Sequence, residues 1–204
     1  MPEIPIPQYF YLNRALMPYD RTHNLQVSAL AALPFGKNKT FLTHGIAAAI
    51  AGGWQLNAII SFDSGEPFTV SASGASLNAP GSSQMADQVK PYVKKFKGVG
   101  PDHPWFDTTA FAPVTAVRFG TAGFDSIRGP GFGNADLSLF RSFTIRQRFT
   151  AQPRIEVFNI TNTPHFSNPD STVGDTNFGT LTSVSAQART TDQRYVKLGF
   201  KMTF

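Results

Sequence analysis

Strict alternation of apolar and polar residues at the C-terminal end of the chain is the feature that most constrains its fold. Over the last ten residues every second position is apolar: Val196, Leu198, Phe200, Met202 and Phe204. Successive side chains of a β-strand point to opposite faces, whereas the side chains of a helix repeat every 3.6 residues. The alternation therefore predicts a strand with one apolar face and one polar face.

Four earlier segments alternate in the same way, so we expect five strands. They are predicted near residues 24–33, 54–64, 134–145, 149–160 and 194–204. A strand of about 10 residues is about 33 Å long, and tilted by about 40° it covers about 25 Å, the height of the apolar band of an outer-membrane barrel. Strands of soluble proteins are usually about 5–6 residues long. The strand length therefore predicts an all-β fold, an antiparallel segment of a transmembrane β-barrel.

The connections between these strands alternate between long and short. The long ones span residues 65–133 and 161–192, and the shorter ones span 34–53 and 146–148. Outer-membrane barrels carry long extracellular loops and short periplasmic turns. If the last strand ends in the periplasm, the two long connections are extracellular loops and the two shorter connections are periplasmic.

Composition excludes several other classes of protein. Charged residues make up 15% of the 204 residues, against about 25% in ordinary soluble domains. No apolar run approaches the roughly 18 residues of a membrane-spanning helix. Because cysteine is absent, a disulfide scaffold, a cysteine-ligated metal site and a thiol nucleophile are excluded. The first residues lack the basic and apolar regions of a secretory signal, so we expect a cytosolic protein or a piece of a longer reading frame.

No group of residues indicates catalysis, a cofactor or a metal. The oxygen-rich segment 170–175 could hold calcium in a loop, but its spacing matches no known calcium-binding loop. The net charge of +5 raises the question of nucleic-acid binding. However, four of the lysines form a single loop cluster with no helix behind it, at Lys90, Lys94, Lys95 and Lys97. We expect this loop to be solvated or to contact lipopolysaccharide, and we expect no enzyme activity and no nucleic-acid partner. The four histidines are scattered, at His23, His44, His103 and His165.

The polar faces of the predicted strands supply the candidate site residues. In a wide barrel such groups line a water-filled lumen and pair across strands, because polar groups buried from lipid need partners or water. The lumen-lining candidates are Asn57, Asp63, Asp136, Ser138, Arg154, Glu156, Lys197 and Lys201.

Two residues conflict with the strand pattern. Arg141 falls on the apolar face of the third strand, where a lipid-facing arginine costs about 2–4 kcal/mol at the membrane midplane. Because Arg141 is close to a predicted periplasmic turn, we expect its side chain to reach the lipid headgroups. Pro153 lies inside the fourth strand and cannot donate a ladder hydrogen bond. We expect a bulge at Pro153, or a strand that begins after it.

Short motifs in a fixed order resemble one family. They begin with Gly-Gly-Trp-Gln-Leu at 52–56, Ser-Gly-Glu-Pro-Phe at 64–68 and Trp-Phe-Asp at 105–107 with Ala-Phe at 110–111. They continue with Arg-Gly-Pro-Gly at 128–131, Asn-Ala-Asp-Leu-Ser at 134–138 and Glu-Val-Phe-Asn-Ile-Thr-Asn-Thr-Pro at 156–164 with Phe166. With the terminal strand, this order is similar to the C-terminal part of TonB-dependent outer-membrane receptors. The nearest resemblance is to the Oar-like group with a carboxypeptidase-regulatory-like domain, abundant in Acidobacteria.

The resemblance implies a barrel of 22 strands with an N-terminal plug, which takes up a scarce ligand with energy delivered by TonB. This chain would supply about 5–6 of those strands, without plug or signal peptide. The implied partners are outer-membrane lipid and lipopolysaccharide, the barrel assembly machinery, the rest of the receptor, and TonB through the missing N-terminal part. Phe200 and Phe204 would carry the assembly signal. Five or six strands leave open edges that lipid does not tolerate, so we expect no membrane-spanning barrel from this segment alone.

A soluble β-sandwich that binds or adheres to glycans is the alternative. In a sandwich the apolar faces of two sheets pack on each other. Three aromatic residues of the long connection would then form a binding loop, namely Trp105, Phe106 and Phe111.

Overall fold

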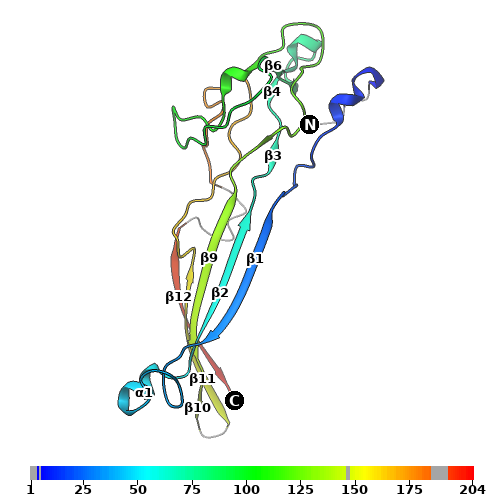
Figure 1. Cartoon of the computed structure of the whole chain (residues 1–204). Helices are drawn as coiled ribbons and strands as arrows, with labels where there is room; N and C mark the ends of the chain where they lie inside the picture. The colour runs from blue at the N-terminus through cyan, green and yellow to red at the C-terminus, as the bar shows by residue number, and fades with distance from the viewer. Residues whose placement is uncertain (1–3, 5, 146–147, 185–192) are drawn as a thin grey trace. The chain divides into compact units, whose positions relative to one another are not determined.

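The computed structural model describes the chain except for residues 1–3, 5, 146–147 and 185–192, which Figure 1 draws in grey. The chain divides into two compact units. The sheet unit consists of residues 24–62, 133–164 and 190–204, and the loop unit consists of residues 1–23, 63–132 and 165–189. Among the described residues, no helix is long and apolar enough to cross a membrane.

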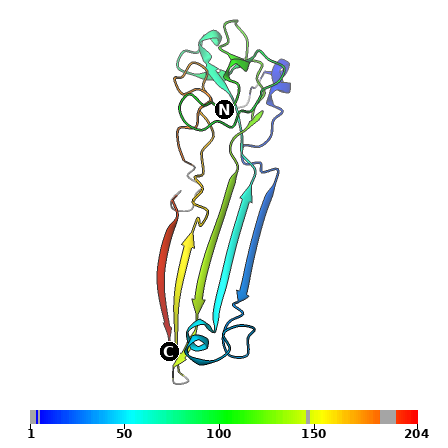
Figure 2. The same cartoon turned by 60° about the vertical axis from the view of Figure 1, so that its left-hand side comes forward.

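Long strands and one short strand form the described part of the sheet unit. They are β1 (Asn24–Ala32), β2 (Trp54–Asp63), β9 (Phe132–Arg141), β10 (Phe143–Ile145), β11 (Phe149–Phe158) and β12 (Tyr195–Thr203). The order across the sheet is β1-β2-β9-β11-β12, and β10 continues the line of β9 beside β11 (Figure 2). β11 runs antiparallel to β9, β10 and β12. The expected all-β, antiparallel fold is confirmed.

The strand register collects the apolar residues on one face of the sheet. Val157 lies opposite Val196, and Ile155 lies opposite Leu198. Residues directly opposite each other in an antiparallel pair point to the same face. On the other side of β11 the same two residues lie opposite Leu137 and Leu139 of β9. The apolar residues that alternate in the sequence therefore form one continuous apolar face across β9, β11 and β12.

This apolar face is open rather than packed. Leu198 is 75% exposed and Phe200 is 65% exposed. The apolar residues of β1 are also exposed, with Leu25 at 56%. In a sandwich, a second sheet would cover such a face. An exposed apolar face of this size instead indicates contact with lipid or with another protein.

The expectation of a bulge or a late strand start at Pro153 is wrong. β11 begins at Phe149, and its pairing with β12 continues in unbroken register from Thr150 to Phe158, with Pro153 opposite Phe200. On its other side β11 pairs with β10 through residues 149–151 and with β9 through residues 154–157. Pro153 thus lies opposite the break between β9 and β10, where the ladder on that side of β11 is interrupted. The missing N–H of Pro153 coincides with this break.

Short strands and turns build the loop unit around a core of its own. Two-stranded sheets in its described residues pair β3 (Pro67–Phe68) with β8 (Ile127–Arg128), β4 (Ser71–Ser73) with β5 (Ser83–Met85), and β6 (Asp87–Gln88) with β7 (Phe111–Ala112). The same part of the chain contains the 3-10 helices η1 (Pro7–Asn13), η2 (Gly74–Leu77) and η3 (Thr108–Ala110). The sequence predicts long loops in these segments, whereas the structure shows a folded unit.

Phe106 is the centre of the loop-unit core. It is fully buried, and its ring meets those of Phe111 and Phe178 edge-on, at centroid distances of 5.8 and 5.5 Å. Edge-to-face packing is a favoured arrangement of aromatic rings. Phe111 is also buried. Both residues are therefore core side chains, and the expectation that they form a binding loop is not met.

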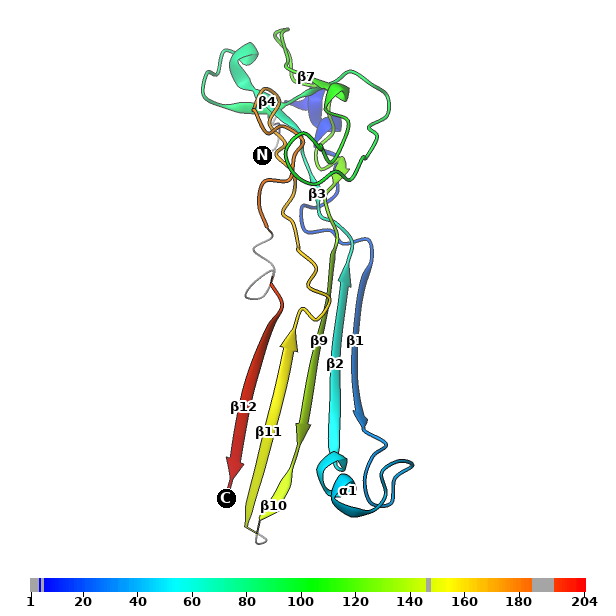
Figure 3. The same ribbon diagram turned by 90° about the vertical axis from the view of Figure 1, so that its left-hand side faces the viewer.

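A link of residues 33–53 joins β1 to β2 and contains one short helix, α1 (Gly45–Ala51), beside the start of β2 (Figure 3). The backbone N–H of Leu33 donates to the carbonyl of Trp54 at 2.9 Å, which closes the link at its base. Gly36 has a φ of +107°, and a Cβ on it would lie 2.6 Å from the Cα of Gly52. The link therefore requires a glycine at position 36, where its backbone approaches that of Gly52.

Candidate functional site

Polar side chains cross the sheet unit in rows, one residue from each neighbouring strand. The central row contains Ser138 of β9, Glu156 of β11 and Lys197 of β12, which lie directly opposite one another. Glu156 and Lys197 have opposite charges, and opposite charges at facing positions stabilise a strand pair. The structure therefore brings together three of the predicted site residues on one face.

Arg154 occupies the adjacent row, between Phe140 and Gly199. Its Nη1 donates to Glu156 Oε1 at 3.4 Å, and its Nη2 donates to Gln152 Oε1 at 3.2 Å. Its guanidinium carbon is 5.8 Å from the centre of the Phe140 ring. A Cβ on Gly199 would lie 2.8 Å from Arg154 Cγ. Gly199 thus leaves the space in which Arg154 crosses to β12.

Asp136 holds the end of the sheet together. Its Oδ1 accepts hydrogen bonds from Asn134 Nδ2 and from the backbone N–H of Asn159, both at 2.9 Å. The second bond ties the residue that follows β11 to the middle of β9, so Asp136 anchors the C-terminal end of β11 to its neighbour. This structural role was not foreseen from the sequence.

The remaining predicted site residues are more scattered. Lys201 of β12 lies opposite Gln152, one row beyond Arg154. Asn57 is half-buried on β2, and Asp63 ends β2 and belongs to the loop unit. Phe200 lies on the apolar face opposite Pro153, and Phe204 follows β12 and is 94% exposed.

Arg141 acts differently from the expectation that it reaches the headgroups alone. Its Nη1 donates to the carbonyls of Ala49 and Ile50, at 2.6 and 3.0 Å. Its guanidinium carbon is also 4.2 Å from the centre of the Phe143 ring. A cation at the last carbonyls of a helix is favourable. Arg141 therefore ties the C-terminal end of α1 to β9, although α1 is too short and too rich in small residues to be predicted.

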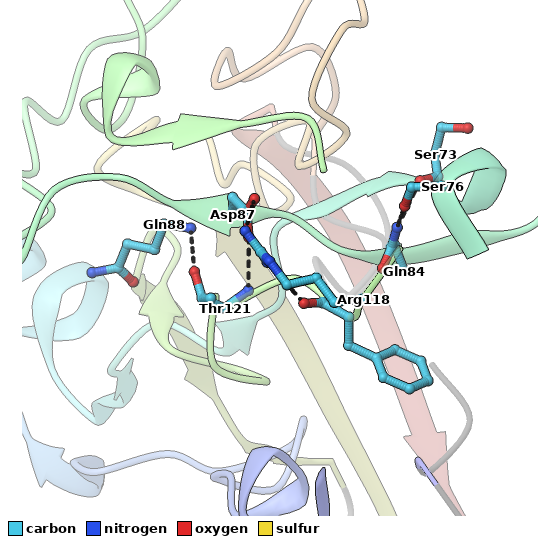
Figure 4. A network of polar contacts seen from close by, with 8 residues as sticks. Ser73, Ser76, Gln84, Asp87, Gln88, Arg118 and Thr121 are labelled. Carbon is cyan, nitrogen blue, oxygen red and sulfur yellow. Dashed lines mark hydrogen bonds and ion pairs between the residues drawn. The ribbon is translucent and has the colours of Figure 1, made fainter. Parts of the chain in front are cut away.

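An ion pair braces the loop unit around Asp87, drawn in Figure 4. Arg118 Nη1 donates to Asp87 Oδ1 at 2.6 Å, and its Nη2 donates to Oδ2 at 2.8 Å. The backbone N–H of Thr121 also donates to Oδ1, at 3.2 Å. The hydrogen bonds from Arg118 lower the pKa of Asp87 and burial opposes them, with the charge of Arg118 and the bonds from Thr121 adding to the lowering. Such two-point pairing also fixes geometry.

This ion pair predicts a pH dependence of the loop unit. The folded-state pKa of Asp87 is lowered below its ordinary value of 3.8, so its contribution is full above that pH and is lost as the pH falls through the folded pKa. We expect Asp87→Asn to cost less than about 1 kcal/mol at neutral pH, typical of a partly exposed pair. The difference from the unchanged chain should disappear in acid. Urea unfolding at several pH values measures it.

Asp102→Asn is the matched control for this experiment. Asp102 is an exposed turn residue and makes no ion pair among the described residues. Its replacement should leave the acid dependence unchanged. An Asp87→Asn chain that loses stability with acid as steeply as the unchanged chain would contradict the prediction.

The lysine cluster is not one uniform basic patch. Lys90 Nζ lies 2.7 Å from Asp107 Oδ2, and this hydrogen bond is the main cause that lowers the pKa of Asp107. Lys94 lies over the ring of Phe96, 5.6 Å from its centre. Burial lowers the pKa of Lys95, with further lowering by the charges of neighbouring cations. All four lysines of the loop are exposed, as expected for a solvated loop, although Lys90, Lys94 and Lys95 differ in their neighbours. Within the described residues no three His, Asp or Glu side chains gather as metal ligands.

Comparison with known proteins identifies the family. A family model described as an outer membrane beta barrel domain matches residues 3–194, nearly the whole chain. No curated protein matches the chain, and no solved structure does. The match agrees with the long antiparallel strands and the exposed apolar face, and it indicates an outer-membrane location. The chain belongs to the family of outer membrane beta-barrel domains.

Proposed function

We propose that this chain forms part of the barrel wall of a TonB-dependent receptor of the Oar-like group, which takes up a scarce ligand with energy from TonB. The observation that carries the proposal is the two-sided sheet. Leu198 is 75% exposed on one face, while Glu156 and Lys197 lie opposite each other on the other face. A barrel strand needs these two surfaces, one for lipid and one for a wet lumen.

The edges of the sheet support a role as a part of a larger barrel. Among the described strands, β1 pairs only with β2, and β12 pairs only with β11. Unpaired strand edges in lipid leave backbone N–H and C=O groups without partners, which costs several kcal/mol per group. A closed barrel has at least about eight strands. Further strands of the receptor would therefore pair with both edges.

The connectivity supports an orientation in the membrane. The segments that join β2 to β9 and β11 to β12 are the long ones, and they supply most of the loop unit. In this proposal they lie outside the cell, and the link of residues 33–53 lies in the periplasm. The ligand would meet the loop segments and pass the rows that contain Arg154 and Glu156. A glycan-binding sandwich is a weaker proposal, because its apolar face would be covered.

Single cysteines test the orientation, because the chain has none of its own. We expect Val117→Cys, at a position that is 89% exposed, to react with a membrane-impermeant maleimide on intact cells that produce the whole receptor. Thr40→Cys, at an exposed position of the link, should react only after the outer membrane is opened. Labelling of Thr40→Cys on intact cells would contradict the proposed orientation.

Phe204 gives a second test of the proposal. We expect Phe204→Ser in the whole receptor to lower the amount inserted in the outer membrane severalfold, because the exposed terminal aromatic would be the contact for the assembly machinery. Membrane fractionation with immunoblotting measures the inserted amount. Thr203→Ser, at the neighbouring exposed position, is the control. Unchanged insertion of the Phe204→Ser receptor would show that Phe204 is not part of the assembly signal.

A further inference from the structure

A pocket of about 810 Å³ lies within the sheet unit at the link between β1 and β2. It is lined by cationic, small and polar residues, with Lys37, His44 and Arg141 as its basic members. The others used below are Ala49 and Gly53. No part of the proposed transport route uses this pocket, so its chemistry calls for a separate explanation.

Hydrogen bonds hold the wall of the link pocket in place. Arg141 Nη1 donates both of its hydrogens, to the carbonyls of Ala49 and Ile50. Trp54 Nε1 donates to the same Ile50 carbonyl at 3.0 Å. A guanidinium has five N–H donors, so Arg141 retains its Nε and Nη2 hydrogens for other acceptors. A fixed arginine facing a pocket can bind the oxygens of an anion.

The charge around the link pocket is of one sign. Residues 24–62 contain no aspartate or glutamate, and neither do residues 137–155. None of the ion pairs among the described residues involves Lys37, Lys39 or Arg141. A cluster of cations without carboxylates attracts anions. The pocket is therefore complementary to a negatively charged group.

Exposed apolar side chains flank the same pocket. Ile46 is 80% exposed and Ile50 is 68% exposed. They are four residues apart on α1, so they share one face of the helix. Phe41 and Leu42 of the link are 55% and 50% exposed. Apolar residues beside cations are typical of protein elements that lie in the membrane interface, with apolar groups among the acyl chains and cations at the phosphates.

We propose that the link docks on the periplasmic surface of the membrane and that its pocket holds the phosphate of an anionic phospholipid such as phosphatidylglycerol. Lys37 and the Nη2 group of Arg141 bind the phosphate, while Ile46 and Ile50 enter the acyl boundary. This inference rests on the proposed function, which puts the link at that end of the barrel. Each lysine or arginine near an anionic lipid surface strengthens binding of the protein to that surface about fivefold.

Trp54 is a native reporter for the experiment, because its indole is bonded to α1. The chain with Trp105→Phe leaves Trp54 as its single tryptophan. It is placed in nonionic detergent micelles with phosphatidylglycerol or phosphatidylcholine brominated on the acyl chains. We expect phosphatidylglycerol to quench Trp54 at about a 25-fold lower lipid fraction than phosphatidylcholine, about fivefold for each of the two cations.

Variants at one lysine separate the pocket from general charge. Lys37→Gln should lower the preference for phosphatidylglycerol about fivefold, and Lys37→Arg should keep it. Lys94→Gln, in the loop unit, removes the same charge elsewhere and should keep the preference. Far-ultraviolet circular dichroism verifies that each variant retains its β-structure.

The outcomes decide between the inference and its alternatives. Equal quenching by the two lipids, or a preference that is unchanged in Lys37→Gln, overturns the docking inference and leaves the proposed function in place. A change in Trp54 emission with inorganic phosphate but no lipid preference overturns it in favour of a small-anion site. A chain that is monomeric without detergent, and whose sheet unit melts cooperatively there by Trp54 fluorescence, contradicts the proposed function, and the docking inference fails with it.

Discussion

Leu198→Arg is expected to destabilise the sheet unit in phospholipid or detergent by about 2–4 kcal/mol, the cost of a lipid-facing arginine near the middle of an outer-membrane barrel. Leu198 is 75% exposed. In a water-soluble sheet, an exposed leucine can be replaced by arginine with a change within about 0.5 kcal/mol. The size of the effect therefore tells a lipid-facing surface from a water-facing one. Denaturant unfolding of the Trp105→Phe chain in micelles, followed by Trp54 fluorescence, measures it.

Lys197→Gln is the matched control, one residue away on the opposite face. Lys197 lies opposite Glu156, so its loss removes one cross-strand charge pair, worth about 0.2–1 kcal/mol. We expect a small effect at Lys197 and a large one at Leu198. Equal effects at the two positions would contradict the assignment of the apolar face to lipid.

Phe106→Ala is expected to lower the free energy of unfolding of the loop unit by about 3–5 kcal/mol, the usual cost of removing a buried phenylalanine. Its ring is fully buried and contacts three other rings, those of Phe68, Phe111 and Phe178. Such a loss is a large fraction of the stability of a small domain. The measurement is urea unfolding of the Trp54→Phe chain, followed by the fluorescence of Trp105.

Tyr92→Ala provides the comparison within the same unit. Tyr92 is also aromatic, but it is 72% exposed, and we expect its loss to change stability by less than about 0.5 kcal/mol. If Phe106→Ala were as mild as Tyr92→Ala, the loop unit would have no cooperative core around Phe106. The segments would then behave as the loops that the sequence predicts.

The five long strands were predictable because apolar and polar residues alternate over about ten consecutive positions in each of them. Once Leu198 and Ile155 are assigned to one face, the register follows from keeping each strand's apolar residues on that face. The pairing of Ile155 with Leu198 agrees with this argument. Pro153 misled the sequence argument because the effect of its missing donor depends on the neighbouring strand, which no local pattern describes.

The core of the loop unit could not be predicted from periodicity. Its strands are two or three residues long, as in β6 and β7, too short to show an alternation. Phe106 is buried by residues that are distant in the chain, such as Phe68 and Phe178. No short motif distinguishes Phe106, which is buried, from an exposed aromatic residue of a loop. The phenylalanines and alanines that are frequent in the loop-unit core are the signal that the sequence offers.

The sequence predicts which polar residues form the rows across the sheet, but it does not predict which of them lie opposite one another. The sequence places Glu156 and Lys197 on polar faces, and the register makes them opposite neighbours. The dependence of Arg154 on the missing side chain of Gly199 requires knowledge of which strands are adjacent. The helix-capping role of Arg141 likewise depends on a contact across 91 and 92 residues of sequence.

The contact between Ser71 and the segment near Thr172 has a consequence for the order of folding. The backbone N–H of Ser71 donates to the carbonyl of Ser171, and Ser71 accepts from Val173, both at 2.8 Å. Closing a loop of this length in an unfolded chain costs about 4 kcal/mol of entropy by the logarithmic rule. The hairpin of β10 and β11 closes only a few residues, because Ile145 lies opposite Phe149, so its entropic cost is much smaller. This hairpin should therefore form before the contact at Ser71, and defects in the Phe106 core should mainly accelerate unfolding.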